Sequence, residues 1–237
     1  MNRPRLLIED WLPAAAIGVE CMRERGSASA LAPHTYLHVW WARRPLCASR
    51  AAVLASLLPA DFSRDAFERL LGFWGSTAQI VSAQQLVDFA RQYGGRIENP
   101  HGQRAFKNAI REDDLNAAHK AAQRLWGNHI TVIDPMTGGG SIPLESARLG
   151  FNTLANEYNA VACSVLEATV DYPFRFGEHL ARKAREWAAV LRERFNMRME
   201  RFFPKTGALP PLCYIFARTV PCPDTQHQTP RFLTGTW

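Results

Sequence analysis

Residues 130–159 read ITVIDPMTGGGSIPLESARLGFNTLANEYN, and this stretch decides the fold. Its apolar, β-branched start predicts a strand that ends at Asp134. Three consecutive glycines come next, followed by a helical pattern that begins near Ser141 and stops at Gly150. A second short strand follows and ends beside an acid, Glu157. This order of strand, glycine turn, helix, strand and acid predicts an α/β fold with parallel strands.

The same order predicts a ligand. Glycines accept positive φ and let the backbone approach a bound molecule closely. The N-terminus of the following helix directs free N–H groups at that molecule. An acid at the tip of the second strand can bind both hydroxyls of a ribose. We therefore expect an adenosine-containing cofactor at the carboxyl edge of the sheet. The alternative is an ordinary strand–turn–helix that binds nothing.

The glycine pattern narrows the choice of cofactor. A phosphate-binding Walker loop needs Lys and then Ser or Thr after its last glycine, whereas Ser141-Ile142 stands here. The dinucleotide pattern G-x-G-x-x-G is absent, because the glycines are contiguous. Asp134-Pro135 before the glycines instead resembles the first motif of S-adenosylmethionine-dependent amino-methyltransferases. By that resemblance Asp134 faces the methionine end of the cofactor and Glu157 holds the ribose. The candidate cofactor-binding residues are Asp134, Pro135, Thr137, Gly138, Gly139, Gly140, Ser141, Glu157 and Asn159.

A second stretch, residues 35–50, reads TYLHVWWARRPLCASR. Together with the glycine block it resembles an adenine-specific DNA methylase family whose members begin with Leu-His-x-Trp-Trp-Ala-Arg-Arg-Pro and carry a zinc-ribbon-like insertion. The family's Asp-Pro-Phe-x-Gly-Gly-Gly-Ser-Ile-Pro-Leu-Glu-Ala is matched by residues 134–146, with Met136 in place of Phe. Its later Asp-Leu-Asn-Pro-Val-Ala is matched by residues 157–162. The resemblance covers most of residues 3–60 and 126–222.

The resemblance implies a function and a fold. The function is SN2 transfer of a methyl group from S-adenosylmethionine to the exocyclic amine of adenine in DNA, within restriction or phage defence. The fold is a partial Rossmann-like methyltransferase fold after a helical N-terminal region. Five side chains of the second stretch are candidates for flanking the cofactor or binding DNA, because aromatic rings stack on bases and guanidinium groups bind phosphates. They are His38, Trp40, Trp41, Arg43 and Arg44. The alternative is that the tryptophans are core residues and the arginines pair with acids.

The sequence lacks the second motif that such an enzyme needs. That motif is Asp, Asn or Ser, then Pro-Pro and an aromatic residue, which orient the target amine and stack on the flipped base. The only Pro-Pro pair, Pro210-Pro211, stands between two leucines. We therefore assign no catalytic residue and expect the chain to be an inactive N-terminal fragment that binds the cofactor, with DNA as the partner of the full-length protein. The alternative is a non-catalytic nucleotide-binding regulatory or partner subunit.

Composition agrees with a soluble protein. The chain has 237 residues, a net charge of +6 and no apolar run near the ~20 residues of a membrane span. Its five cysteines are scattered and odd in number, which favours a reducing compartment over a disulfide framework. We expect a cytoplasmic location without membrane contact. We expect no bound metal, since only Cys222 and His227 could serve as ligands at the start of the insertion. The oligomeric state stays open.

The chain divides into four predicted parts. They are an N-terminal family-specific segment (1–60), a helical region (61–125), a Rossmann-like part with a long helix (126–203) and the start of a ribbon-like insertion (204–237). Among the helices we expect one over residues 43–58 and one that begins with a capping box at Ser82 and ends at Gly94. The basic helix over 178–203 fits either a solvated face of ion pairs or a phosphate-binding surface.

Overall fold

The computed structural model describes residues 4–26, 31–202, 219–220 and 231–232. The chain forms two compact units, Met1–Ala181 and Arg182–Trp237. The first unit is mostly helical and contains a small parallel sheet. The second holds the end of helix α10 and two short antiparallel strands, β3 (Thr219–Val220) and β4 (Arg231–Phe232). The predicted insertion and its Cys222 and His227 lie otherwise outside the described residues.

Four helices form the N-terminal part: α1 (Leu7–Asp10), α2 (Ala14–Arg25), α3 (Pro33–Leu37) and α4 (Leu46–Leu57). Pro13 lies between α1 and α2 as the N-cap residue of α2, where its missing N–H costs no helical hydrogen bond. The helix expected from residue 43 begins at Leu46, because Pro45 is its extended N-cap residue. Residues 38–45 therefore form a connecting segment between α3 and α4.

The next helices are α5 (Arg64–Leu70), α6 (Thr77–Tyr93) and α7 (Glu112–Trp126), and a 3₁₀ turn, η1 (Ala105–Lys107), lies between α6 and α7. The predicted start of α6 at Ser82 is wrong. The capping box is formed by Ser76 and Gln79. The extra turn is kept because Ile80 packs on Ala16 and Val19 of α2. The predicted end is confirmed: Gly94 closes α6 in the left-handed conformation.

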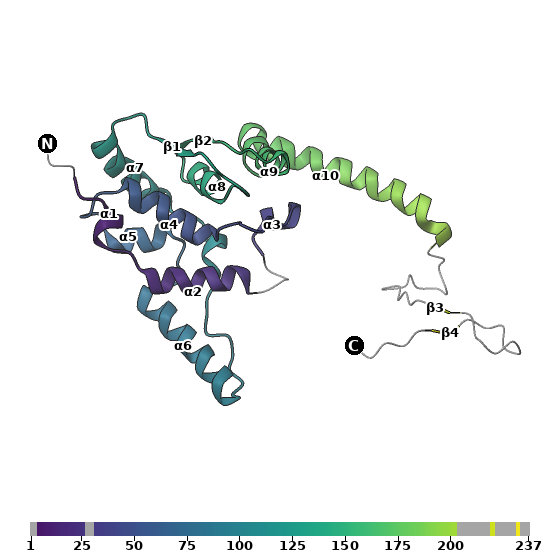
Figure 1. Cartoon of the computed structure of the whole chain (residues 1–237), viewed down its shortest axis with the longest axis horizontal. Helices are drawn as coiled ribbons and strands as arrows, with labels where there is room; N and C mark the ends of the chain where they lie inside the picture. Colours follow the sequence, from purple (N-terminus) through teal and green to yellow (C-terminus); the bar gives the residue numbers. More distant parts are fainter. Residues whose placement is uncertain (1–3, 27–30, 203–218, 221–230, 233–237) are drawn as a thin grey trace, which may run out of the picture. The chain divides into compact units, whose positions relative to one another are not determined.

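The decisive stretch folds in the predicted order. Strand β1 (Thr131–Asp134), helix α8 (Ser141–Arg148) and strand β2 (Asn152–Ala155) form one βαβ unit (Figure 1). The strands are parallel, with Thr131 opposite Asn152 and Asp134 opposite Ala155. The α/β prediction is thereby confirmed at the level of this unit. Within the described residues the parallel sheet has two strands, so the larger Rossmann-like fold stays a prediction.

The described residues cover only one face of the parallel sheet. Val132 packs with Ile142 of α8 on the core. Ile133 and Leu154, which pair across the sheet, are 66% and 60% exposed. Parallel sheets are usually covered on both faces. The unit therefore presents an apolar face that the described residues leave open.

Four helical segments follow the sheet in the described residues: α9 (Ala160–Leu166), a π-helical turn η2 (Glu167–Asp171), α10 (Tyr172–Met199) and a 3₁₀ turn η3 (Glu200–Phe202). Gly177, with φ 51°, interrupts α10 near the predicted start of the basic helix. Ion pairs at helical spacing occur along α10, for example Lys183 with Glu186 at 2.8 Å. They fit the solvated-face alternative.

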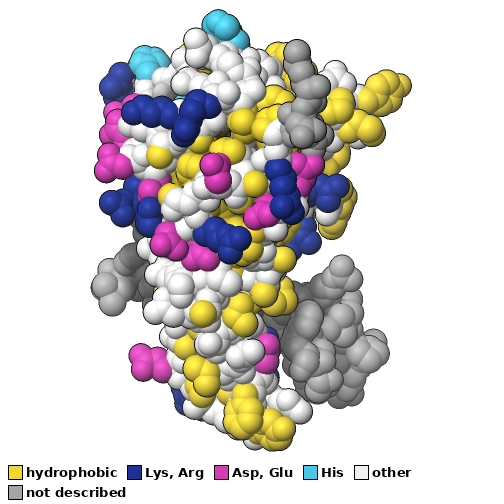
Figure 2. All heavy atoms as spheres, turned by 90° about the vertical axis from the view of Figure 1, so that its left-hand side faces the viewer, with side chains coloured by type: hydrophobic (Ala, Val, Ile, Leu, Met, Phe, Trp, Pro, Cys, Tyr) yellow, Lys and Arg dark blue, Asp and Glu magenta, His cyan; other side chains and the backbone are white. Residues whose placement is uncertain are grey.

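Figure 2 shows one face of the molecule, where Lys and Arg side chains alternate with Asp and Glu side chains. Exposed and partly exposed ion pairs such as Arg69 with Asp114, 2.8 Å apart, agree with this mixing. The net charge of +6 does not gather into a uniform basic field on this face.

The largest apolar core lies around α4. Leu54 and Leu58 from α4 and its end pack with Phe67 and Leu70 of α5, and Leu149 joins them from the end of α8. Helix α4 packs on both α2 and α8 (Figure 1). It thereby connects the N-terminal helices to the βαβ unit.

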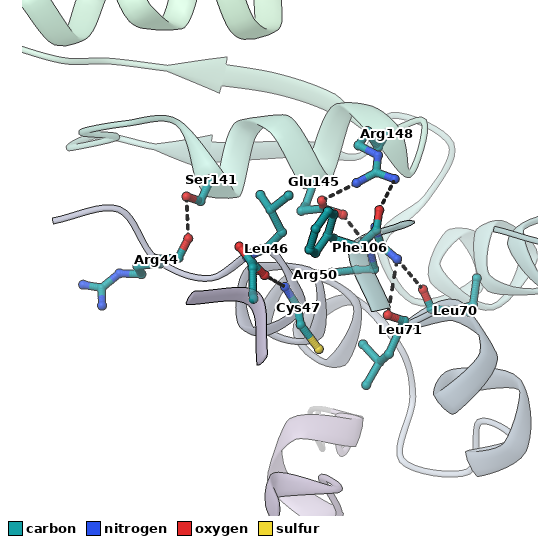
Figure 3. Close-up of polar contacts among 11 residues, drawn as sticks. Arg44, Leu46, Cys47, Arg50, Leu70, Leu71, Phe106, Ser141, Glu145 and Arg148 are labelled. Atoms are coloured by element: carbon teal, nitrogen blue, oxygen red, sulfur yellow. Dashed lines mark hydrogen bonds and ion pairs between the residues drawn. The ribbon is translucent and has the colours of Figure 1, made fainter. Parts of the chain in front are cut away.

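A buried ion pair reinforces this connection (Figure 3). Arg50 of α4 donates from Nε to Glu145 of α8 at 2.5 Å, and both side chains are at most 1% exposed. Arg50 also donates to the carbonyl of Leu71 at 3.3 Å, and Arg148 donates to the other Glu145 oxygen at 2.7 Å. The carboxylate thus holds α8 against α4 with charge-assisted hydrogen bonds.

We predict that Glu145→Ala destabilises the protein by about 3–5 kcal/mol, because it leaves the Arg50 guanidinium buried without its acid. Urea unfolding followed by circular dichroism measures this. The double variant Arg50→Met/Glu145→Met should recover much of the loss. The exposed pair Arg175–Asp171 serves as control, and Arg175→Ala should cost at most about 1 kcal/mol. Equal losses in Glu145→Ala and Arg175→Ala would contradict the prediction.

Candidate cofactor-binding site

The glycine loop joins β1 to α8 in a conformation that glycine favours. Gly138 has φ 54° and Gly140 has φ 79°, both in the left-handed region. Gly140 is the N-cap residue of α8, and no side chain caps that helix. The loop is also tied to the end of β2, because Thr137 donates from its backbone and its hydroxyl to the Asn156 carbonyl at 3.1 and 2.6 Å.

Glu157 contacts the glycine loop directly. One carboxylate oxygen accepts the Gly138 N–H at 2.6 Å, and the other accepts the N–H groups of Tyr158 and Asn159 at 2.9 and 3.0 Å. The hydrogen bonds from Asn159 and Gly138 lower the pKa of the Glu157 carboxyl. The acid after β2 and the glycines after β1 are therefore neighbours, as the sequence predicted.

The other candidates of the stretch have local roles that the structure defines. Asp134, at the end of β1, accepts the Met136 N–H at 3.2 Å, and the Pro135 carbonyl accepts from Asn156 at 3.1 Å. Asn159 caps α9 by accepting the Val161 N–H at 2.9 Å. A capping role accounts for its side chain without a ligand.

The N-terminal segment covers the glycine loop. A Cβ at residue 138 would lie 2.9 Å from the Trp40 Nε1 atom, and one at residue 139 would lie 2.9 Å from the Arg43 Nε atom. Both distances are shorter than real Cβ contacts. The sequence suggested that these glycines make room for a ligand. The structure shows that they also make room for the chain's own Trp40 and Arg43.

The five side chains of this segment separate into two groups. Trp40 is half-buried and Arg43 is 8% exposed, and both contact the loop. Trp41 is 90% exposed, and His38 and Arg44 are exposed as well. Ser141 donates to the Arg44 carbonyl at 2.7 Å, while the Arg44 side chain points away from α8 (Figure 3). Trp40 and Arg43 contact the glycines themselves, whereas Arg44 lines a cavity beside them.

Two cavities adjoin the loop. The smaller, about 240 Å³, is lined by Asp134, Thr137, Gly138 and Ser141. The N-terminal segment adds Ala42, Arg43 and Arg44 to its lining. The larger, about 720 Å³, runs along β2 between α8 and α9, and Glu157 and Cys163 are among its lining residues. No local pattern in the sequence predicts the larger cavity, because its walls come from separate elements that only the packing of α9 and η2 brings together.

One comparison found a match. A family described as "Protein of unknown function (DUF1156)" matches residues 11–70, which include Trp40 and Arg43 and end before the glycine loop. No curated protein and no solved structure matches the chain. Among the described residues, no three potential metal ligands come together, and no helix is both long and apolar enough for a membrane span.

We predict that Gly139→Ala destabilises the protein by about 1–3 kcal/mol, because the new methyl group meets Trp40 and Arg43. Thermal unfolding without any ligand measures this. The control is Gly18→Ala on α2, where no atom lies within 4 Å of the added Cβ. That change should stabilise by about 0.5–1 kcal/mol, since alanine favours a helix. A neutral Gly139→Ala would mean that Trp40 and Arg43 do not press on the loop.

Proposed function

We propose that the chain is the N-terminal, cofactor-binding part of an S-adenosylmethionine-dependent DNA adenine methyltransferase that acts on the exocyclic amine. One observation supports this above the others. Asp134, the glycine loop and Glu157 lie together at the carboxyl ends of two parallel strands, where α/β proteins bind nucleotides. The two cavities beside them provide space for the two ends of such a cofactor.

Each group has a proposed role. Glu157 accepts hydrogen bonds from both ribose hydroxyls, and the larger cavity beside it takes the adenosine part. Asp134 faces the charged methionine end in the smaller cavity. The cofactor supplies a methyl group on a sulfonium centre. The residues of this chain bind the adenosine and amino-acid ends of the cofactor and so orient the sulfonium centre. Such positioning lowers the barrier of a direct displacement.

The second half of the reaction is not provided for in the sequence. No Asp, Asn or Ser precedes Pro210-Pro211, and no aromatic residue follows it directly. These prolines lie outside the described residues. The proposal is therefore that this chain binds cofactor and needs a further polypeptide segment to orient adenine. The same observation favours, as a second candidate, a nucleotide-binding regulatory or partner subunit.

We propose that DNA contacts come from the exposed group of the N-terminal segment. Trp41 presents most of its ring to solvent, next in sequence to the glycine-loop contact of Trp40. An exposed aromatic ring such as that of Trp41 can stack on a base, and an exposed guanidinium such as that of Arg44 can bind a phosphate. In the full-length protein, Trp41→Ala should weaken binding to single-stranded DNA, measured by fluorescence anisotropy, and should leave the affinity for the cofactor unchanged.

We predict that isothermal calorimetry detects binding of S-adenosylmethionine or its demethylated product, S-adenosylhomocysteine, and no binding of ATP. The reason is that the loop offers no Lys after its glycines for a triphosphate. ATP binding of equal or greater strength would overturn the proposed function and favour the regulatory alternative.

We predict that Glu157→Ala and Glu157→Gln lower the affinity for S-adenosylhomocysteine roughly tenfold or more, because each loses charge-assisted hydrogen bonds to ribose. The Gln variant keeps one acceptor oxygen, so it retains either the Gly138 N–H bond or the bonds from Tyr158 and Asn159. It should therefore lower the melting temperature of the ligand-free protein less than the Ala variant does. Glu98→Gln, at an exposed position in the loop after α6, is the control for removing one negative charge. If the two Glu157 variants bind as tightly as the wild type, Glu157 is a structural acid of the loop.

A further inference from the structure

Arg43 is a buried cation without a hydrogen-bonding partner. Its side chain belongs to a residue that is 8% exposed, and all three guanidinium nitrogens are buried without an acceptor among the described residues. Burying an unpaired charge costs several kcal/mol. Burial accordingly lowers the pKa of Arg43. A protein retains such a group where something else supplies the acceptor.

The acid whose charge affects the pKa of Arg43, Glu24, already accepts hydrogen bonds from backbone N–H groups. Glu24 of α2 accepts the Leu46 N–H with both carboxylate oxygens, at 3.0 and 2.9 Å, and so caps α4. Burial and the charges of Arg43 and Arg148 lower the pKa of His34 to about 4, so His34 is neutral and adds no second cation. The positive charge of Arg43 is therefore uncompensated by direct contact.

The position of Arg43 indicates what the missing acceptor is. Its Nε atom lies against Gly139, and the residue lines the smaller cavity together with Gly138 and Ser141. The N-terminus of α8, which has eight residues and no side-chain cap, begins at the same place. A guanidinium and the free N–H groups of a helix N-terminus both favour an anion. Two independent features thus favour negative charge at one point.

The same cavity also holds an acid. Asp134 lines it, and its carboxylate accepts from the Met136 N–H at 3.2 Å. The cavity is lined by two arginines, Arg43 and the exposed Arg44, and by one acid, so it offers a partner to each charge of a zwitterion. The α-amino acid group of S-adenosylmethionine is such a zwitterion, with an ammonium and a carboxylate on one carbon atom.

We infer that Arg43 binds the α-carboxylate of the cofactor's amino-acid end, across the smaller cavity from Asp134, which faces the ammonium. This inference rests on the proposed function and adds a binding residue to it from the N-terminal segment. The planar fork of the guanidinium fits a carboxylate with two parallel hydrogen bonds. The three guanidinium nitrogens are buried in the described conformation, so binding requires a local shift of the N-terminal segment that exposes them to the carboxylate.

The test compares two ligands that differ only at this end. S-adenosylhomocysteine carries the amino-acid group, whereas 5′-methylthioadenosine ends in a methyl thioether. Calorimetry should show that the wild type binds S-adenosylhomocysteine roughly tenfold or more tightly, since a buried charge pair contributes at least one factor of ten. Arg43→Gln should remove most of this preference and leave the affinity for 5′-methylthioadenosine within about twofold. Arg91→Gln, which removes an exposed charge on α6, should change neither ligand.

The melting temperature of the ligand-free protein distinguishes binding from a structural role. Because the charge is unpaired, Arg43→Gln should leave the melting temperature unchanged or raise it. A lower melting temperature with equal losses for both ligands would overturn the inference, as would an unchanged preference. If the wild type binds neither ligand, the proposed function fails and the inference falls with it. Arg43-dependent binding of ATP or inorganic phosphate without S-adenosylhomocysteine binding would assign a phosphate site instead.

Discussion

The Arg50–Glu145 ion pair is the constraint on which the rest of the first unit depends. Glu145 lies one turn into α8, so fixing its carboxylate also fixes the helix whose N-terminus carries the glycine loop. Arg50 lies on α4, and α4 follows the segment that holds Trp40 and Arg43. One buried contact therefore sets the register between the loop and the segment that covers it. A displacement of α8 would lengthen the hydrogen bond between Arg50 and Glu145 while both charges stay buried. Because an unpaired buried charge is costly, this pair opposes such a displacement.

The sequence predicted the βαβ unit well because its signals are local. β-branched runs, contiguous glycines and a terminal acid act through backbone conformation within a few residues. The error at α6 shows the limit of such signals. Ser76 and Ser82 both have a glutamine three residues on, and only the packing of Ile80 on α2 decides between them. Local patterns indicate single strands and do not show how many strands join one sheet, so they could not predict the size of the parallel sheet.

The sequence nominates the residues of the candidate site, and the structure shows where each of them lies and what it contacts. Sequence reasoning grouped Arg43 with Arg44, and nothing in two adjacent arginines says which is buried. The turn at residues 40–43, closed by the Arg43 N–H on the Trp40 carbonyl at 3.2 Å, directs them apart. Likewise, the sequence predicts that Gly139 leaves space for a ligand. The structure places Trp40 and Arg43 against it, and these residues stand nearly a hundred positions earlier in the chain. Tertiary contacts of that separation leave no periodic trace in a sequence.

The hydrogen bond between Glu157 and the Gly138 N–H gives the site two exclusive occupancies. In the described conformation the acid of the chain fills a donor that an incoming ligand could use. A ligand that needs that donor must displace Glu157, so its apparent affinity is reduced by the fraction of molecules in which the loop is closed. Glu157 in that state is an internal competitor, present at a fixed effective concentration that no dilution changes. A ligand that uses the Gly138 N–H must therefore offer Glu157 another donor, or the carboxylate loses the hydrogen bond that it makes in the described conformation.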